Sequence, residues 1–266
     1  WCAGCTATAG ALTVHETPMR VLVAHNSYQM RGGEDTVVDA EVALLRSHGH
    51  SVVEYRRHND ELKGMRTTAA ALDTLWSRKT EHDLHALIGQ SQPGVIHVHN
   101  TFPLISPSIY WAAHRHGIPV VQTLHNFRLL CPQAMFLRDG KVCEVCLGKV
   151  PWRAVQHSCY RDSRAQSAAL AGMLVVHRTL GTWQQRVVRF IALNDFCRNK
   201  FIQGGLPAER IAVKPNFVDF DAPPQGQRDG FLFVGRLSPE KGVATLANAM
   251  AATVGITLNV AGEGPD

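Results

Sequence analysis

The chain has 266 residues, a hydrophobic share of 45% and a formal net charge of +5. These values suit a packed globular protein with one large or two small domains. The basic residues are scattered, so no basic patch of the kind that binds nucleic acid is present. The longest apolar run, residues 168–176, is roughly half the length of a membrane span, which argues against a transmembrane helix.

Residues 1–18 are small and weakly periodic, unlike the rest of the chain, whereas Met19 directly precedes the first clear strand. We expect residues 1–18 to be a leader that is disordered or non-native. The seven cysteines are unevenly placed and do not form the framework of a secreted disulfide-rich domain. A cytoplasmic protein is therefore expected.

From Arg20 onward, short apolar runs alternate with segments of helical periodicity. This alternation predicts a doubly wound parallel α/β sheet of the Rossmann-like type. The expected strands are residues 20–24, 52–55, 95–98, 119–124, 190–193 and 211–213. The expected helices are residues 37–49, 69–76, 81–88, 107–115, 163–189 and 196–203. Together these elements predict a first domain over residues 19–220, with an irregular cysteine-containing insertion at residues 126–161.

The region after this domain predicts a linker and the start of a second domain. Residues 221–230 are rich in Pro, Gly and Gln, a composition typical of a linker. A second α/β pattern begins at Phe231 and extends to Asp266, which is long enough for about one βαβ unit. Such a unit cannot bury a core of its own, so we expect a truncated second Rossmann-like domain over residues 231–266.

The segment FLFVGRLSPEKG, residues 231–242, predicts a strand, a tight turn and a helix start. A helix N-terminus offers unpaired N–H groups and the positive end of a dipole. Arg236 can bind phosphate oxygens through its guanidinium, Lys241 adds a point charge, and Gly235 and Glu240 complete the turn. The pattern is therefore typical of a diphosphate site, although a surface loop with two solvated cations would look the same.

Further candidates follow the strands, because open α/β sheets bind ligands at the carboxyl ends of their strands. Gly32 and Gly33 come after the first strand and allow close approach of the backbone to a ligand. Their spacing is not that of a dinucleotide-binding loop. His125 and Asn126 follow the strand VVQTL. The side chains of His97, His99 and Asn100, at another strand end, could line the same cleft, although packing or capping roles would explain them equally well.

The insertion contains Cys131, Cys143, Cys146 and Cys159, with two close thiols between two distant ones. This spacing predicts a structural Zn²⁺ site, although four reduced thiols or a redox pair remain alternatives. A D-x-D motif at residues 219–221 lies beside the linker and is interpreted as a chance match and not a metal site. Segment 164–189 carries several arginines. It is interpreted as a domain helix with a solvated face, with peripheral contact to an anionic membrane as the alternative.

Several of these motifs occur in the order found in GT-B glycosyltransferases of family 4. VGRLSPEKG resembles the start of that family's donor-binding domain, and AGEGPD resembles its next strand and loop. RVLVAHNSYQMRGGEDTVV resembles the first strand and Gly-rich loop. VVQTLHN resembles the strand that ends in a His, and KPNFVD, with Asn216, resembles the stretch before the interdomain linker. The resemblance runs from Met19 to Asp266.

This resemblance implies a GT-B fold and a retaining transfer of sugar from a nucleotide-diphosphate sugar to a glycan, lipid-linked or small-molecule acceptor. His125 would contact the transferred sugar, and Gly33 would lie by the acceptor and the phosphates. Arg236 and Lys241 would stabilise the leaving diphosphate, so that catalysis needs no metal cofactor. The family's E-x7-E pair does not occur before Asp266, so we expect residues 1–266 alone to be inactive. A sugar-nucleotide epimerase of the same fold and a non-catalytic binding module are the alternatives.

Overall fold

The structure is a computed structural model that describes residues 17–218 and 229–264. The chain divides into two compact units, Trp1–Asp219 and Phe220–Asp266. Most of the expected leader and linker, and the D-x-D motif, lie outside the described residues.

The first unit is built on a six-stranded sheet with the order β2-β1-β3-β4-β7-β8, in which every pair of neighbours is parallel. Its strands are β1 (Arg20–Ser27), β2 (Ser51–His58), β3 (Val95–Val98), β4 (Val120–Leu124), β7 (Arg189–Ala192) and β8 (Ile211–Val213). The expected α/β architecture with a parallel sheet is confirmed.

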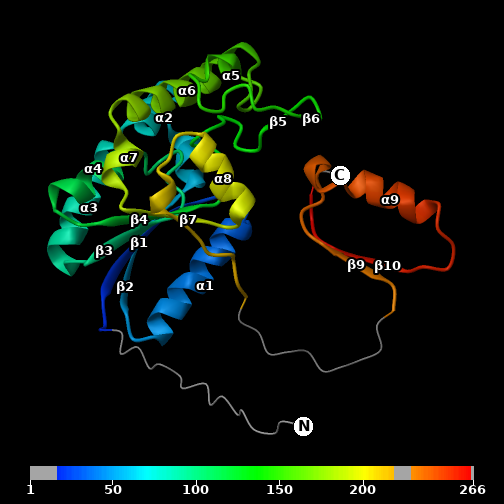
Figure 1. Cartoon of the computed structure of the whole chain (residues 1–266), viewed down its shortest axis with the longest axis horizontal. Coiled ribbons are helices and arrows are strands. Elements are labelled where there is room, and N and C mark those ends of the chain that lie inside the picture. The colour runs from blue at the N-terminus through cyan, green and yellow to red at the C-terminus, as the bar shows by residue number, and fades with distance from the viewer. Residues whose placement is uncertain (1–16, 219–228, 265–266) are drawn as a thin grey trace, which may run out of the picture. The chain divides into compact units, whose positions relative to one another are not determined.

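Helices cover both faces of this sheet (Figure 1). The α-helices of the unit are α1 (Gly33–Ser47), α2 (Thr67–Leu75), α3 (Arg78–Ser91), α4 (Ser108–Arg115), α5 (Trp152–Gln156), α6 (Arg164–Thr179), α7 (Thr182–Arg186) and α8 (Asp195–Gln203). Two short 3₁₀ segments, η1 (Asn59–Gly64) and η2 (Ala208–Arg210), complete it.

The alternation of side chains along β1 explains how the sheet is covered. Val21 and Val23 pack with Val38 and Val42 of α1 on one face. Leu22 and Ala24 point to the opposite face, where they belong to the larger core, which includes residues of α3, α4 and α6. A strand buried on both faces reads as a continuous apolar run, which is why the sequence pattern identified it.

The structure differs from the expected bounds at several elements, and two of the differences have a clear physical cause. The first strand continues past Ala24 to Ser27, because it pairs with β2 over its whole length. The expected helix over residues 163–189 is two helices, α6 and α7, separated at Gly181. Gly181 has a φ of 63°, a left-handed conformation that ends a helix and that glycine adopts at little cost.

Three of the four arginines in segment 164–189 contact other groups of the protein. Arg178 donates to the carbonyls of Lys149 and Leu129, and Arg189 donates to the carbonyl of Glu209. The guanidinium of Arg186 lies 4.4 Å from the centre of the Trp111 ring. These contacts support the interpretation of segment 164–189 as part of the domain.

The cysteine-containing insertion after β4 is mostly irregular. It includes a two-stranded antiparallel hairpin of β5 (Leu137–Arg138) and β6 (Lys141–Val142), followed by α5. Figure 1 shows this hairpin projecting from the unit. The insertion is anchored by Leu130, Cys131 and Phe136, which belong to the main core.

The second unit contains β9 (Phe231–Val234), η3 (Pro239–Lys241), α9 (Val243–Ala251) and β10 (Leu258–Ala261), with β9 and β10 parallel. Phe231, Leu232 and Val234 are more than half exposed. One βαβ unit is too small to bury both faces of its strands, which accounts for this exposure.

None of the helices in residues 17–218 and 229–264 has both the length and the apolar character required to cross a membrane.

Candidate active site

The order of the strands determines where a ligand site can form. From β1 the chain moves outward to β2 and then returns to β3 on the other side of β1. In open α/β sheets this switch point leaves a crevice at the carboxyl ends of the strands. Gly32, His99 and His125 follow β1, β3 and β4, so all three belong to this edge of the sheet.

The connection from β1 to α1 is held by a buried acid and a buried histidine. The carboxylate of Asp35 accepts a hydrogen bond from the Gly32 N–H at 2.9 Å, which caps the helix. Its other oxygen lies 2.9 Å from Nε2 of His25, a residue with no exposed surface. Burial opposes ionisation of Asp35, but these hydrogen bonds outweigh it and lower the pKa of the carboxyl.

Gly32 and Gly33 therefore differ in whether they can contact a ligand. The N–H of Gly32 is already used by Asp35. A β-carbon placed on Gly33, the first residue of α1, would meet no atom within 4 Å. No protein contact requires glycine at residue 33 in the described structure, and the open space above it leaves room for a ligand at a helix N-terminus.

Three histidines at the ends of β3 and β4 form a connected group. Nδ1 of His99 lies 2.9 Å from Nε2 of His125, and Nε2 of His97 lies 2.9 Å from Oγ1 of Thr123. The rings of His97 and His99 are 4.2 Å apart between centroids, and those of His99 and His125 are stacked at 5.2 Å. His97 and His99 therefore lie beside His125, and because both are buried, a role in lining the cleft and a role in packing stay open.

A partly buried ion pair lies beside the histidines. Glu41 of α1 is 6% exposed, and its Oε1 accepts from Nζ of Lys214 at 2.7 Å. Its Oε2 lies 3.6 Å from Nδ1 of His97 and 3.7 Å from Nε2 of His99. Glu41, His97 and His99 form the one group of three possible metal-ligand atoms within 4.8 Å of one another that occurs among the described residues.

The three histidines are neutral at neutral pH. Burial lowers the pKa of His97 to about 4, with the charge of Lys214 acting in the same direction. Burial and the neighbouring histidines hold the pKa of His99 well below its usual value. Burial also lowers the pKa of His125, although Glu34 and Glu41 oppose the shift. A neutral imidazole offers one donor and one acceptor, so the site can bind hydroxyl groups.

The two candidate asparagines are held by the protein itself. Asn100 donates to the carbonyl of Asn26 at 2.9 Å and accepts from the N–H of Phe102. Asn126 donates to Glu34 at 2.8 Å and accepts from the N–H of Arg128. Both side chains thus fix the loops around His125, and each amide keeps one further N–H that these bonds do not use.

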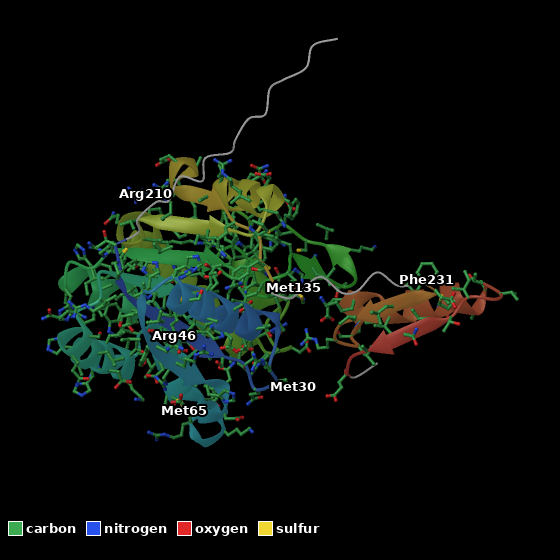
Figure 2. All side chains as sticks on the ribbon, turned by 90° about the horizontal axis from the view of Figure 1, so that it is seen from below. Met30, Arg46, Met65, Met135, Arg210 and Phe231 are labelled. Atoms are coloured by element: carbon green, nitrogen blue, oxygen red, sulfur yellow. The ribbon has the colours of Figure 1, made fainter. Side chains whose placement is uncertain are left out.

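Two pockets lie on this side of the first unit. A small one, about 40 Å³, is lined by His99, Asn100, His125, Asn126 and Arg128 among others. A larger one, about 350 Å³, lies between η1, α2 and α6, and Phe102 lines both. Met65, labelled in Figure 2, is one of the apolar residues that line the larger pocket. Its volume is in the range of small-molecule sites.

In the second unit, the predicted turn carries its two cations at the surface. The guanidinium of Arg236 forms an ion pair with Glu240 at 2.8 Å, and its side chain is 62% exposed. Lys241 ends the 3₁₀ segment η3 and is also exposed. Gly235 has a φ of 158° and donates its N–H to the carbonyl of Ala261.

The helix expected directly after this turn is interrupted. The turn contains only η3, and Gly242 then adopts a φ of 70° before α9 begins at Val243. The interruption follows from Gly242 itself, because glycine enters the left-handed region at little cost. The helix N-terminus invoked from the sequence therefore lies at Gly242, one residue after Lys241, and not within residues 239–241.

The remaining candidates are Asn216 and the four cysteines of the insertion. Asn216 is exposed in the segment after β8. The four insertion cysteines are free thiols, two buried and two half-buried. Burial and the neighbouring thiolates of Cys131, Cys159 and Cys143 raise the pKa of Cys146, so the four sulfurs lie within electrostatic reach. In the described structure, no three of these sulfurs are within 4.8 Å of one another.

Three residues of the network were not predicted from the sequence. Glu41 falls on the apolar stripe of α1, four residues after Val37, and an acid at such a position is a signal of burial with a partner. His25 lies on the extension of β1 that the pattern missed. Lys214 follows a three-residue strand, and nothing in the sequence indicates that it reaches Glu41.

Comparisons with known proteins agree with this architecture. The family model described as Glycosyltransferase Family 4 matches residues 31–222. A comparison with curated proteins gave no match. Among solved structures, HepE from Anabaena in complex with UDP-glucose is similar, with a TM-score of 0.53 and 16% identity over 92% of this chain and 61% of that chain.

A second similar structure is the apo form of the lipopolysaccharide outer core galactosyltransferase WaaB, with a TM-score of 0.52 and 14% identity over 93% of this chain and 62% of that chain. These likenesses confirm the expected GT-B type of fold. The chain spans about three fifths of the length of the structures that it matches.

Proposed function

Because the chain belongs to glycosyltransferase family 4, we propose that it transfers a sugar, with retention of anomeric configuration, from a nucleotide-diphosphate sugar to a hydroxyl-bearing acceptor. The observation that carries the proposal is the neutral His125, which is fixed by His99 at the carboxyl end of β4 in a chain that matches the family over residues 31–222. The UDP-glucose in the HepE structure supports a nucleotide-diphosphate sugar as donor.

The reaction breaks the bond between the anomeric carbon and an oxygen of the diphosphate, joins that carbon to the acceptor oxygen, and transfers the proton of the acceptor hydroxyl to the released diphosphate. The negative charge that builds up on the leaving diphosphate requires cationic or N–H partners already in place. Arg236 and Lys241 would supply the cations, with Gly235 allowing close approach of the backbone and Glu240 orienting Arg236. In this arrangement the charge is met without a metal ion. His125 would bind a hydroxyl of the reacting sugar, and Gly33 would lie beside the phosphates and acceptor, with Asn216 near the donor.

The larger pocket of the first unit supports an acceptor with an apolar portion. Its lining includes Leu62, Met65, Phe102 and Leu170, which would bury hydrocarbon or a hydrophobic ring. The guanidinium of Arg128 lies 4.5 Å from the centre of the Phe102 ring, between this pocket and the small pocket at His125. This arrangement favours a lipid-linked or aromatic acceptor over a purely polar glycan.

The test is a transfer assay on the full-length protein with several nucleotide-diphosphate sugars, UDP-glucose among them, and acceptors with and without an apolar group. Release of nucleoside diphosphate only when an acceptor is present, with the anomeric configuration retained by NMR, is the expected result. Inversion of a sugar carbon without an acceptor would instead identify an epimerase, and donor binding without turnover would identify a binding module.

We also propose that the insertion binds one structural Zn²⁺ through Cys131, Cys143, Cys146 and Cys159. The support is four free thiols within electrostatic reach, on a loop with little regular structure. Zn–S bonds of about 2.3 Å in a tetrahedron place sulfurs roughly 3.8 Å apart, so binding must draw the loop closer together.

Elemental analysis of protein purified without added metal, beside the double variant Cys143→Ser/Cys146→Ser, tests this site. One zinc per wild-type chain and none in the variant is the expected result. Four thiolate ligands leave no open position, so chelation should lower the melting temperature without a direct effect on transfer. A wild-type protein without zinc, or equal zinc in both proteins, would show ordinary thiols.

A further inference from the structure

Glu41 is a buried acid that has no role in the proposed reaction, although its carboxylate lies next to two of the histidines. It projects from the buried face of α1, and an unpaired carboxylate there would be strongly unfavourable. Lys214 compensates its charge through Oε1 at 2.7 Å, whereas Oε2 faces two ring nitrogens, those of His97 and His99, at 3.6 and 3.7 Å. The Lys214 ion pair thus fixes the carboxylate in a place where it meets the histidines.

The bond between His99 and His125 has two possible arrangements of protons. Nδ1 of His99 and Nε2 of His125 are 2.9 Å apart, so one of them donates and the other accepts. Both rings are neutral, so each carries a single proton on one of its two nitrogens. The arrangement is decided at the opposite nitrogen of His99, Nε2, which is buried and has no hydrogen-bond partner among the described residues.

The carboxylate of Glu41 selects between these arrangements. With the proton on Nε2, the ring of His99 presents a positive N–H edge to the carboxylate. With the proton on Nδ1, it presents a lone pair to the same negative charge. A separation of 3.7 Å is too long for a hydrogen bond, but a charge acts strongly over this distance in a buried site. The N–H edge is therefore favoured.

We infer that the Glu41–Lys214 pair, acting through His99, sets the tautomer of His125. His99 carries its proton on Nε2, accepts at Nδ1 from the Nε2–H of His125, and leaves Nδ1 of His125 unprotonated. Glu41, Lys214 and His99 are positioning residues in this scheme. The inference rests on the proposed function for its meaning, since a sugar hydroxyl that reaches Nδ1 of His125 meets an acceptor and must donate.

A metal ion on Glu41, His97 and His99 is the competing explanation for the same cluster. The three ligand atoms lie within 4.8 Å of one another, and both histidines are neutral. However, the single negative charge of Glu41 is already balanced by Lys214, so a divalent ion would add two uncompensated positive charges in a buried position. The desolvation cost of such a charge disfavours the ion and favours the proton network.

The inference can be tested by NMR without substrate. Long-range ¹H–¹⁵N correlation spectra of histidine-labelled protein report which nitrogen of each ring carries the proton, with His99→Gln and His125→Gln used only to assign the signals. In the wild type, both His99 and His125 should be Nε2–H tautomers. An Nδ1–H tautomer for either residue would overturn the inference before any further variant is made.

Glu41→Gln then tests the cause. The side-chain amide can donate an N–H toward Nε2 of His99, so the major tautomers of His99 and His125 should both invert to Nδ1–H. Glu54→Gln is the matched control. Glu54 also forms ion pairs, with Arg46 and Arg56, but it lies on β2, so its substitution should leave both tautomers unchanged. A Glu41→Gln protein with His125 unchanged would contradict the proposed control by the carboxylate.

Lys214→Gln provides a second variant. Loss of the charged partner of Glu41 should lower stability, but the Lys214 side chain is 40% exposed, so water can replace it beside the carboxylate and the variant should still fold. Both Nε2–H tautomers should persist, and His99 should take up a proton at higher pH than in the wild type, because a nearby positive charge is removed. Elemental analysis completes the test. A stoichiometric metal in the wild type whose removal changes the His97 and His99 signals would replace the proton network by a metal site. None of these measurements depends on transfer activity, so a failed assay would leave them intact.

Discussion

The two units of the chain prepare their polar groups for a ligand in opposite ways. In the first unit, His99 and Asn100 at the end of β3 and Glu41 on α1 are less than 10% exposed, and their partners are other protein groups. In the second unit, the side chain of Arg236 is 62% exposed, and Lys241 lies in the open on a short turn. One region is already organised without a ligand, whereas the other presents charge that a ligand would have to organise.

This difference separates two physical contributions to the same proposed reaction. A buried neutral network fixes which group donates and which accepts in each hydrogen bond, because each bond in it determines the next. An exposed cation contributes little until water is excluded from it, because solvent screens its charge. Mutations in the two regions should therefore differ in kind, with changes in the first unit affecting folding and changes in the second affecting only transfer.

The largest expected effect is on transfer and comes from the second unit. In the full-length protein, Arg236→Ala and Lys241→Ala should each slow transfer by roughly 10²–10³-fold, the range for loss of one preorganised charge-stabilising group. Stability should change little, because an exposed ion pair contributes little to it. Initial rates and melting temperatures measure both.

Arg46→Ala is the matched control for Arg236→Ala. Arg46, labelled in Figure 2, is exposed and paired with Glu54 at 2.8 Å, as Arg236 is with Glu240. It lies near the end of α1, away from the Gly33 start of that helix. Its loss should leave transfer unchanged. Wild-type rates in Arg236→Ala and Lys241→Ala would show that the turn is only a surface loop.

The next effect is on stability and comes from the first unit. In the folded protein the pKa of His97 is about 4, below its value of about 6.5 in an unfolded chain. Between these pH values the unfolded state binds a proton that the folded state does not, so stability falls as pH falls from about 6.5 toward 4. His97 alone accounts for on the order of a few kcal/mol, and the lowered pKa values of His99 and His125 act in the same direction.

Urea unfolding at pH 7 and pH 5 checks this pH dependence. The loss of stability between the two pH values should be smaller in His97→Gln than in the wild type, because one of the responsible groups is gone. His82→Gln, a change at an exposed position of α3, should lose as much stability as the wild type. Equal losses in all three proteins would mean that the buried histidines do not determine the acid sensitivity.

The contrast between the regions also explains what could be predicted from the sequence. The parallel sheet followed from apolar runs, and the position of His125 at the carboxyl end of a strand followed from the run before it, because strand periodicity is a local property. The role of His125 in the site stays a prediction. The Glu41–Lys214 pair joins residues 173 positions apart, and only the folded chain brings the side chain of Lys214, which follows β8, to the helix after β1. The break at Gly242 was missed because glycine within a helical pattern is usually tolerated, and its left-handed conformation depends on the turn before it.

The smallest expected effect comes from Gly33, where one substitution in the first unit should change stability and transfer in opposite directions. A β-carbon at Gly33 would meet no atom within 4 Å, and the residue is in the first turn of α1. Gly33→Ala should therefore raise stability by about 0.4–1 kcal/mol through the lower entropy of the unfolded chain. Transfer should nevertheless be slower, because the methyl group occupies the space proposed for phosphates and acceptor.

Gly89→Ala in α3 is the matched control for Gly33→Ala. Gly89 also has open space and a helical position, but it lies near the end of α3 that leads into β3, and not at the carboxyl ends of the strands. Both variants should melt at higher temperature, and only Gly33→Ala should lose activity. If both kept full activity, Gly33 would be an ordinary helix residue, and the space above it would not belong to the site.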